Sequence, residues 1–206
     1  LSDHTATALD LLQGAGAKPV VVVLDNHGLE VLCDLVLVDA IIRLAGAPVV
    51  LHVKDAPVFV SDVTKEDVPG ILDWLEEHEP SLATRLRGFM ADGRLTTKAS
   101  AYYTSARAFW ELPEDLRQDY AGAAAVILKG DANYRRLLGD LHWPYNTDFV
   151  KYARSFWPPT GLICLRTLKS GVAIGIEQKE QDRAKAESEA WLTSGKFAQV
   201  LAASCA

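Results

Sequence analysis

Two short apolar runs and the helical pattern between them constrain the fold more than any other part of the chain. The runs are PVVVVL at residues 19–24 and PVVLHV at residues 48–53, and their β-branched side chains are typical of strands buried on both faces. Residues 29–47 place apolar side chains at intervals of three and four and stop at Gly46, which predicts a helix of about five turns. A strand–helix–strand unit of this kind nearly always has a right-handed crossover between parallel strands. The sequence therefore predicts an α/β fold with a parallel sheet.

Weaker patterns predict the remaining elements. Helices are expected at residues 5–17 and 65–80, from residue 112 and from residue 132, with a helical turn and a loop in residues 83–95. Strands are expected at residues 99–104 and 123–131, with two short strands on either side of residues 169–171. The charged residues 178–191 indicate a solvent-exposed helix or tail.

The composition fits one globular domain and argues against several classes of partner. The chain has 206 residues, of which 49% are hydrophobic and 23% charged. Its formal charge of −6 argues against nucleic acid and anionic membranes, because both are polyanions. The longest apolar stretch, residues 31–53, is interrupted by Asp34, Asp39 and Arg43, and no segment resembles a signal peptide. We expect a cytoplasmic location, where three unclustered cysteines would stay reduced.

Polar residues that follow the predicted strands are the candidates for a functional site. In doubly wound sheets, ligands bind beyond the carboxyl ends of the strands, where loops and helix N-termini meet. Four ends carry such residues: Asp25 and Asn26; Ser61 and Asp62; Lys129, Gly130 and Asp131, followed by Asn133 and Arg135; and Arg166 and Thr167, followed by Lys169. The sequence lacks the fingerprints of serine hydrolases, P-loop proteins and dinucleotide-binding proteins.

The oxygen-bearing residues among these have the chemistry of a site for a hard metal. The carboxylates of Asp25 and Asp62 and the amide of Asn26 suit Mg²⁺, Mn²⁺ or a similar cation that keeps positions open for water and substrate. The alternative is structural, because the same residue types commonly cap helices and turns. His27 could be a further ligand or a base, or an exposed loop histidine.

Five cations lie near two further strand ends of this acidic chain: Lys129, Arg135, Arg136, Arg166 and Lys169. Gly130 lets the backbone approach a ligand, and the helix that follows directs its N–H groups towards an anion. Phosphoryl transfer requires cations opposite a carboxylate-bound metal, because its catalysis depends on positioning and charge neutralisation. The alternative places the arginines among them in surface pairs with Asp131, Asp140 and Glu177. Taken together, the clusters favour a phosphate-processing site.

Four motifs occur in order, namely LDNHGLEVLCD, FVSDVT, LKGDANYRRLLGD and LRTLKS, and TSGKFA follows near the end of the chain. In this combination the sequence resembles the metal-dependent damage-control phosphatases, the family that includes the acidic-residue methyltransferase 1 like proteins. The resemblance runs from Val20 to Phe197. It implies a Rossmann-like, three-layer αβα sandwich with a mostly parallel sheet. It also implies hydrolysis of phosphomonoesters, notably sugar phosphates such as fructose 1-phosphate, with Mn²⁺, Co²⁺, Ni²⁺ or Mg²⁺.

The resemblance further implies a role for each matching residue. The implied metal ligands are Asp25, Asn26 and Asp62. The implied catalytic residues are Asp25, Asp62 and Lys169. The implied substrate contacts are Asp25, Asn26, Glu30, Asp131, Asn133, Tyr134, Arg135, Arg166 and Lys169. The expected partner is a small phosphorylated metabolite.

Two departures from the family leave other interpretations open. Family members usually carry a helical N-terminal region that is absent here, so residues 1–206 are expected to form a single α/β catalytic domain. The chain is then either a fragment that contacts the missing region or a compact relative. His27 stands where small residues are commoner.

The alternative functions are an S-adenosylmethionine-dependent protein carboxyl methyltransferase and a non-catalytic binding module that keeps the fold. Against the methyltransferase, the first buried strand ends in Asp-Asn rather than in a glycine-rich loop.

Overall fold

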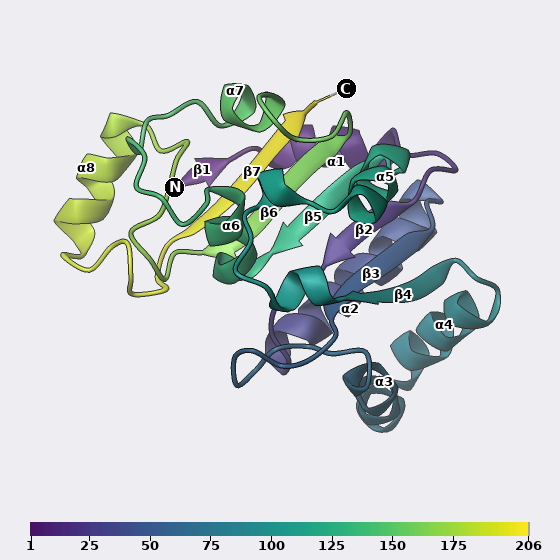
Figure 1. The fold of residues 1–206 in the computed structure, drawn as a ribbon. Helices are drawn as coiled ribbons and strands as arrows, with labels where there is room; N and C mark the ends of the chain where they lie inside the picture. The colour runs from purple at the N-terminus through teal and green to yellow at the C-terminus, as the bar shows by residue number, and fades with distance from the viewer. Residues whose placement is uncertain (206) are drawn as a thin grey trace.

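The four valines Val20–Val23 form strand β2, an internal strand of a seven-stranded sheet in the computed structural model (Figure 1). The structure describes residues 1–205. All four valines are buried, as expected of a strand that is covered on both faces. The other strands are β1 (Ser2–Asp3), β3 (Val49–Lys54), β4 (Leu95–Ser100), β5 (Ala125–Lys129), β6 (Gly161–Thr167) and β7 (Ala198–Ser204), and the order across the sheet is β1-β7-β6-β5-β2-β3-β4.

The sheet is mostly parallel. Strand β2 pairs in parallel with β3 on one side and with β5 on the other, and β4 and β6 extend the parallel region outwards. Strand β7 is antiparallel to β6, and β1 completes the edge beside β7. The predicted α/β fold is therefore confirmed. The chain order reverses between β2 and β5, which is the position where doubly wound sheets bind ligands.

Helices cover both faces of the sheet and complete three layers (Figure 1). Val20 and Val22 pack with the helices of one face, and Val21 and Val23 pack with those of the other face. The first face carries α1 (Thr5–Gln13), α2 (Leu29–Ala40), the π-helical turn η1 (Ile41–Ala45), α3 (Asp67–His78) and α4 (Pro80–Ala91). The second face carries the 3₁₀ turns η2 (Ala101–Thr104) and η3 (Phe109–Glu111), α5 (Glu114–Gly122), α6 (Gly130–Leu137) and α7 (Phe149–Arg154). Helix α8 (Gln178–Glu187) contributes to a smaller apolar cluster.

The strand predicted at residues 99–104 is correct only for its first two residues. Strand β4 ends at Ser100, and the turn η2 follows. Tyr102 and Tyr103 are both buried in the same apolar cluster. Consecutive residues of a strand face opposite sides of the sheet, so a strand could not place both rings in this cluster. The turn allows both to reach it.

The second strand predicted after residues 169–171 is also wrong. Its backbone bonds to loops instead, because the amides of Gly175 and Ile176 donate to the carbonyls of Thr147 and Tyr145. The place beside β6 is taken by β7, which the sequence did not predict. A further difference concerns residues 83–95, where a complete helix, α4, replaces the predicted single turn.

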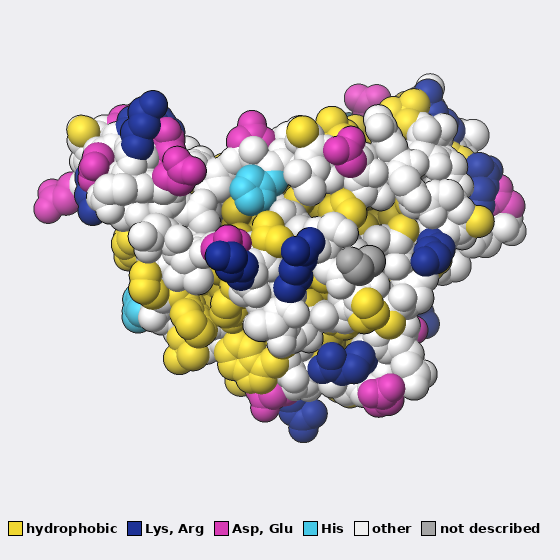
Figure 2. Space-filling model, turned by 90° about the horizontal axis from the view of Figure 1, so that it is seen from above, with side chains coloured by type: hydrophobic (Ala, Val, Ile, Leu, Met, Phe, Trp, Pro, Cys, Tyr) yellow, Lys and Arg dark blue, Asp and Glu magenta, His cyan; other side chains and the backbone are white. Residues whose placement is uncertain are grey.

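The surface seen in Figure 2 carries Lys and Arg side chains scattered among acidic ones, and no large basic patch appears on that face. Among residues 1–205, no helix combines the length and the apolar character needed to cross a bilayer. The prediction that nucleic acid is not a partner stays a prediction.

Candidate active site

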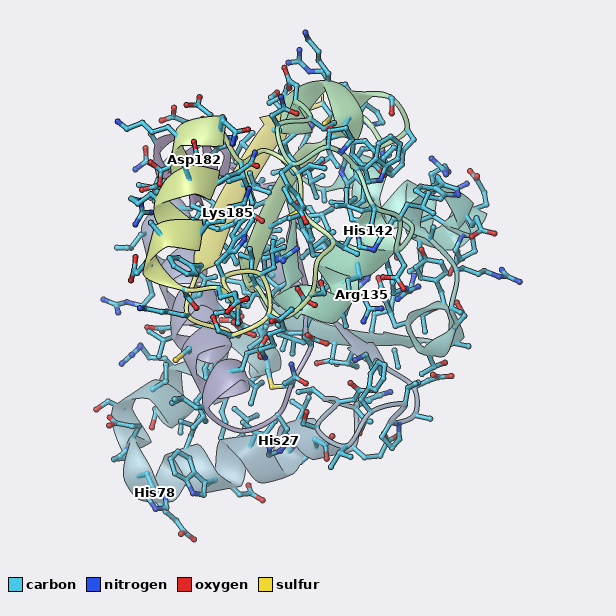
Figure 3. All side chains as sticks on the ribbon, turned by 90° about the vertical axis from the view of Figure 1, so that its left-hand side faces the viewer. His27, His78, Arg135, His142, Asp182 and Lys185 are labelled. Carbon is cyan, nitrogen blue, oxygen red and sulfur yellow. The ribbon has the colours of Figure 1, made fainter. Side chains whose placement is uncertain are left out.

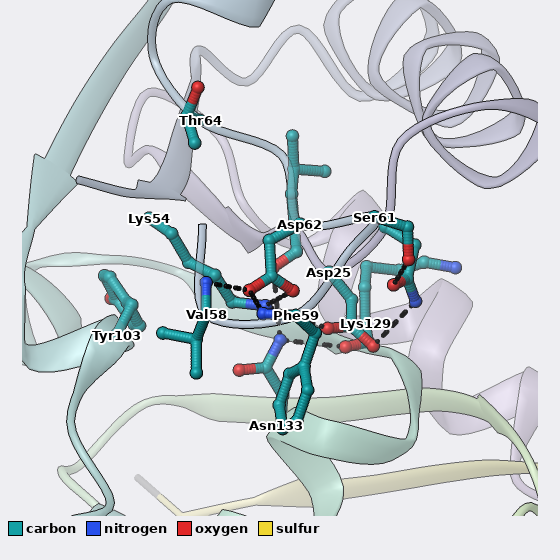
Figure 4. A network of polar contacts seen from close by, with 12 residues as sticks. Asp25, Lys54, Val58, Phe59, Ser61, Asp62, Thr64, Tyr103, Lys129 and Asn133 are labelled. Carbon is teal, nitrogen blue, oxygen red and sulfur yellow. Dashed lines mark hydrogen bonds and ion pairs between the residues drawn. The ribbon is translucent and has the colours of Figure 1, made fainter. Parts of the chain in front are cut away.

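The carboxyl end of β2 places Asp25 beside a loop that carries Asp62 (Figure 4). Asn26 and Asp62 form an isolated antiparallel bridge, and the amide of Val63 donates to the carbonyl of Asp25 at 3.1 Å. Asp62 does not follow a strand as predicted, because residues 57–61 form part of the loop between β3 and α3. The loop nevertheless brings the three predicted metal ligands together at the point where the strand order reverses.

Asp62 is fixed by the backbone of its own loop. The amides of Val58 and Phe59 each donate to its Oδ2 at 2.8 Å, and the ammonium of Lys54 pairs with its Oδ1. Burial alone would raise the pKa of this carboxyl, but the hydrogen bonds from Lys54, Phe59 and Val58 hold the pKa below its usual value. Asp62 is therefore an ionised carboxylate with a fixed orientation.

Asp25 is the more deeply placed member of the pair and is 4% exposed. Burial raises the pKa of its carboxyl, and the opposing attraction of Lys54, 3.3 Å from Oδ1, offsets that effect only in part. Gly130 begins α6 directly against this side chain and has a φ of 79°, a conformation that favours glycine. The close approach of α6 and β2 therefore depends on the absence of a side chain at position 130.

Lys54 is a site residue that sequence reasoning missed. It is the last residue of β3, is 5% exposed, and its ammonium lies between the carboxylates of Asp25 and Asp62. One signal was available, since Lys54 ends the strand next to β2 and so lies at the same edge as Asp25. A lysine that ends a strand is usually solvated, and only the loop that carries Asp62 buries this one.

Asn26 connects the carboxylates to helix α2. Its Nδ2 donates to Asp25 Oδ2 at 3.1 Å and to Glu30 Oε2 at 3.0 Å, and its Oδ1 accepts from the hydroxyl of Ser61 at 2.7 Å. Glu30 lies in the first turn of α2, which begins after Gly28. In this orientation the amide nitrogen, not the oxygen, faces the carboxylates, and rotation of the amide by half a turn would exchange the two.

This donor set fits a hard divalent cation. Two carboxylates face one another with a single ammonium between them, so negative charge remains uncompensated at Asp25 and Asp62. No three His, Cys, Asp or Glu side chains within residues 1–205 form a ready metal cluster. A cation here would be held by Asp25, Asp62 and the Asn26 oxygen, with its other positions left to water and substrate.

A cleft of about 430 Å³ lies beside the carboxylates, and Lys54 forms part of its wall. Two different kinds of surface line it. The apolar lining includes Val58, Phe59, Tyr103 and Trp110, and the polar lining includes Lys54, Asn133, Arg135 and Asp140. A cleft with an apolar wall and a few convergent polar groups is typical of a site for a small molecule.

The GDANYR stretch places its members in three different environments. Asn133 lines the cleft, and its Nδ2 donates to the carbonyls of Leu24 at 3.2 Å and Lys129 at 2.9 Å, which ties α6 to the ends of β2 and β5. Arg135 also lines the cleft and pairs with Asp140, with Nε 2.6 Å from Oδ1. Tyr134 does not fit the predicted substrate contact, because it is fully buried and its hydroxyl accepts from the amide of Ile174 at 3.2 Å.

Asp131 and the buried Arg166 form a second ion pair. The guanidinium Nη2 of Arg166 lies 3.2 Å from Asp131 Oδ1, and its Nη1 donates to the carbonyl of Val172 at 2.8 Å. The Arg166 side chain has no exposed surface and is not part of the cleft lining, and its role as a substrate contact stays a prediction. Ser170 also donates to Asp131, at 3.4 Å, which places the neighbouring Lys169 at this end of the sheet. Lys169 is exposed and forms no ion pair within the described residues.

Two of the predicted cations serve the fold. The ammonium of Lys129 lies 2.8 Å from Asp34 Oδ1, and Arg136 donates to the carbonyls of Tyr102 and Arg107 at 2.9 and 3.0 Å. Neither residue forms one of the surface pairs that the alternative named, whereas Arg135 pairs with Asp140 and Arg166 with Asp131, as that alternative expected. His27 is exposed in the loop ahead of α2, well apart from Arg135 (Figure 3).

Comparison with known proteins identifies relatives of this chain. The sequence model of the damage-control phosphatase ARMT1-like domain matches residues 1–184. The damage-control phosphatase ARMT1 of Rattus norvegicus is 34% identical over 197 residues, which cover 88% of this chain and 43% of that protein. The corresponding protein of Danio rerio is 32% identical over 187 residues, which cover 87% of this chain and 42% of that protein. The chain thus spans less than half the length of these relatives.

A solved structure supports the fold independently. A DUF89 family protein from Pyrococcus horikoshii superposes with a TM-score of 0.53 at 16% sequence identity, covering 82% of this chain and 46% of that one. The family-model match covers most of the chain, and several relatives exceed 30% identity over more than four-fifths of it. The chain therefore belongs to the damage-control phosphatase ARMT1-like family.

Proposed function

We propose that this chain is a metal-dependent phosphatase that hydrolyses phosphomonoesters of small metabolites. The observation that carries the proposal is the facing carboxylate pair, Asp25 and Asp62, beside a cleft at the point where the strand order reverses. Membership of the damage-control phosphatase ARMT1-like family supports the same activity. The proposal concerns the matched region only, since the relatives are more than twice as long.

Asp25, Asp62 and the Asn26 oxygen are the proposed metal ligands. When bound, a divalent cation would neutralise phosphate charge and polarise a phosphorus–oxygen bond. Asp62 contributes a carboxylate that two backbone amides hold in place, so it needs little reorganisation during the reaction. Asp25 contributes a carboxylate in a dry position, where its interaction with a cation is stronger than in water.

The cleft wall is the proposed binding surface for the rest of the substrate. Arg135 in the cleft wall and the exposed Lys169 outside it are the proposed contacts for negative charge. Glu30 and Asp131, which also lie outside the cleft lining, are the proposed acceptors of hydrogen bonds from hydroxyl groups. This combination of cations and acids supports sugar phosphates, such as fructose 1-phosphate, as the substrate class. The proposed cations are Mn²⁺, Co²⁺, Ni²⁺ or Mg²⁺, because the donors are oxygens and leave positions open.

Phosphate release from a panel of phosphomonoesters tests this function. The 206-residue chain is incubated with sugar phosphates and other metabolite phosphates in the presence of each of the four cations. We expect release that stops on chelation and that Asp25→Asn abolishes. The matched control is Asp10→Asn, which removes the same charge from an exposed position on α1 and should leave the rate unchanged.

No release with any cation, from a chain shown to be folded, would contradict the proposal. Release that persists undiminished in Asp25→Asn would contradict the assignment of the site. Transfer of a methyl group from S-adenosylmethionine to protein carboxylates, without phosphate release, would favour the methyltransferase instead.

A further inference from the structure

Lys54 is in contact with both candidate metal ligands and also faces the cleft. Its ammonium lies 3.3 Å from Asp25 Oδ1 and pairs with Asp62 Oδ1, and the residue forms part of the cleft wall (Figure 4). Its side chain is 6% exposed. A lysine in this position is both a counter-ion for the carboxylates and a cation of the cleft wall.

Apart from the exposed Lys169, the other cations of this region already have partners within the protein. Arg136 is bound to backbone carbonyls, Lys129 to Asp34, and the buried Arg166 to Asp131. Arg135 lines the cleft but is paired with Asp140. Lys54 differs from all of these, because its partners are the carboxylates that a divalent cation would take.

The net charge of the group formed by Asp25, Asp62 and Lys54 changes sign when a divalent cation binds. Asp25 and Asp62 carry two negative charges against the single positive charge of Lys54, which leaves an excess of one negative charge. A divalent cation on the two carboxylates converts this excess into one positive charge. The carboxylates then no longer need the ammonium, and an ammonium without a partner in a buried position requires a new anion.

The side chain of Lys54 can make this change without movement of the backbone. Lysine carries three donors on a flexible stem of four carbons, so its ammonium can reorient over a few ångströms. Because Lys54 already lines the cleft beside Asn133 and Arg135, a phosphate held at the carboxylates from the cleft side would lie within its reach.

We propose that Lys54 binds the phosphate group of the substrate, and that its ammonium leaves Asp25 and Asp62 for the phosphate when a divalent cation occupies the carboxylate pair. Lys54 is then a catalytic residue in addition to those that the motifs indicated. This inference rests on the proposed function and deepens it.

Separate titrations of metal and phosphate test the proposal. Binding of Mn²⁺ alone is followed by the electron paramagnetic resonance signal of the free ion, and binding of inorganic phosphate to the Mn²⁺-loaded chain is followed by calorimetry. The variant is Lys54→Met, which keeps the length of the side chain and removes its charge. The matched control is Lys98→Met, which removes one positive charge from the neighbouring strand β4, where Lys98 pairs with Asp119.

For Lys54→Met we expect an Mn²⁺ affinity that is unchanged or higher, because a competing cation has been removed. We expect the affinity for phosphate to fall at least about tenfold, since a charge-assisted hydrogen bond is lost. Lys54→Arg should recover part of the phosphate affinity, and Lys98→Met should behave like the unmodified chain in both titrations. Circular dichroism checks the fold of each variant, and Lys54→Gln replaces Lys54→Met if the latter loses structure.

Two results for the lysine variants would overturn the proposal. Unchanged phosphate affinity would mean that the ammonium never reaches the phosphate. A tenfold or greater loss of Mn²⁺ affinity would mean that Lys54 only shapes the carboxylate pair. A different result, no Mn²⁺-dependent phosphate binding by the unmodified chain, would refute the proposed function itself and the role of Lys54 with it.

Discussion

The α-carbon of Gly130 stands against the side chain of Asp25, so that a Cβ atom at position 130 would lie 1.9 Å from Asp25 Oδ2 and 2.7 Å from Asp25 Cβ. The second distance means that the whole aspartate side chain, not only its carboxylate, would have to move. The start of α6 and the end of β2 therefore fix each other, and the position of a metal ligand depends on a glycine in a different segment of the chain.

Gly130→Ala should weaken metal binding more than it weakens the fold. Gly93 provides the matched control, because its φ of 81° is similar and no atom lies near its missing Cβ. Gly93→Ala should lose about 1–2 kcal/mol of unfolding free energy from the left-handed conformation, and Gly130→Ala should lose more, because Asp25 must also shift. Only Gly130→Ala should also lose Mn²⁺ affinity, by about tenfold or more, because Asp25 is displaced. Denaturant unfolding and Mn²⁺ titration measure the two effects, and equal Mn²⁺ affinities in the two variants would refute this account.

Tyr134→Phe should affect stability and leave substrate binding intact. The hydroxyl of Tyr134 accepts from the amide of Ile174 in the interior, so its removal leaves a buried donor without a partner, at a cost of about 1–3 kcal/mol. Arg135→Ala, by contrast, removes a cleft residue and should raise KM with little change in unfolding free energy. Urea unfolding and steady-state kinetics separate the two, and a raised KM in Tyr134→Phe would restore that residue as a substrate contact.

Arg166 and Asp131 should be coupled in stability. Arg166→Met leaves the Asp131 carboxylate in a mostly buried position with Ser170 as its remaining partner. In a double-mutant cycle with Asp131→Asn, we expect a coupling free energy of about 1–3 kcal/mol. Urea unfolding of the two single variants and the double variant gives this value. Additive effects would mean that the pair contributes nothing beyond its separate packing.

His52 should make the fold less stable as the pH falls below neutrality. Burial lowers the pKa of His52 to about 4 from an ordinary value of 6.5, so the unfolded chain binds the extra proton first. The unfolding free energy therefore decreases as the pH falls, by about 2 kcal/mol between about pH 7 and about pH 5. Asp34 has the opposite effect on the unfolding free energy as the pH falls, because burial raises its pKa to about 6 despite the nearby Lys129.

The comparison with His52→Gln isolates the histidine from Asp34. Unfolding midpoints at both pH values are measured for the unmodified chain and the variant. The unmodified chain should exceed the variant in stability by more at the higher pH, because His52 is then neutral in both the folded and the unfolded chain and its contribution to stability is complete. A pH dependence that is identical in the two proteins would show that His52 is not the group responsible.

The central sheet could be predicted from the sequence because its signal is local. The valines of β2 and the helical spacing after Leu29 each determine a structure within a few residues. Strand β7 has no such signal, since AQVLAAS is rich in alanine and its strand conformation depends on pairing with β6. The sequence therefore predicted the parallel centre and missed the antiparallel edge.

Some residues of the candidate site could likewise be predicted from a local sequence signal, and others could not. Asp25 and Asn26 follow a recognisable strand, whereas Asp62 was assigned to a strand end and is in fact held in a loop by the amides of Val58 and Phe59. The role of Lys54 could not be predicted, because it depends on two carboxylates that are brought to it from different segments of the chain. The motifs also grouped Tyr134 and Arg166 with the substrate contacts, although burial removes both from the cleft. A sequence motif records which residues occur together and not which of them are accessible.

The pairing of β1 with β7 also limits the order in which the chain can fold. Ser2 and Asp3 lie in register with Gln199 and Val200, close to the opposite end of the chain. This edge cannot form until the last strand has left the ribosome, whereas β2, β3 and the helix between them are adjacent in sequence and can associate early. Until residues 198–204 are available to pair with it, β6 presents an unpaired edge, and such an edge can pair with another chain.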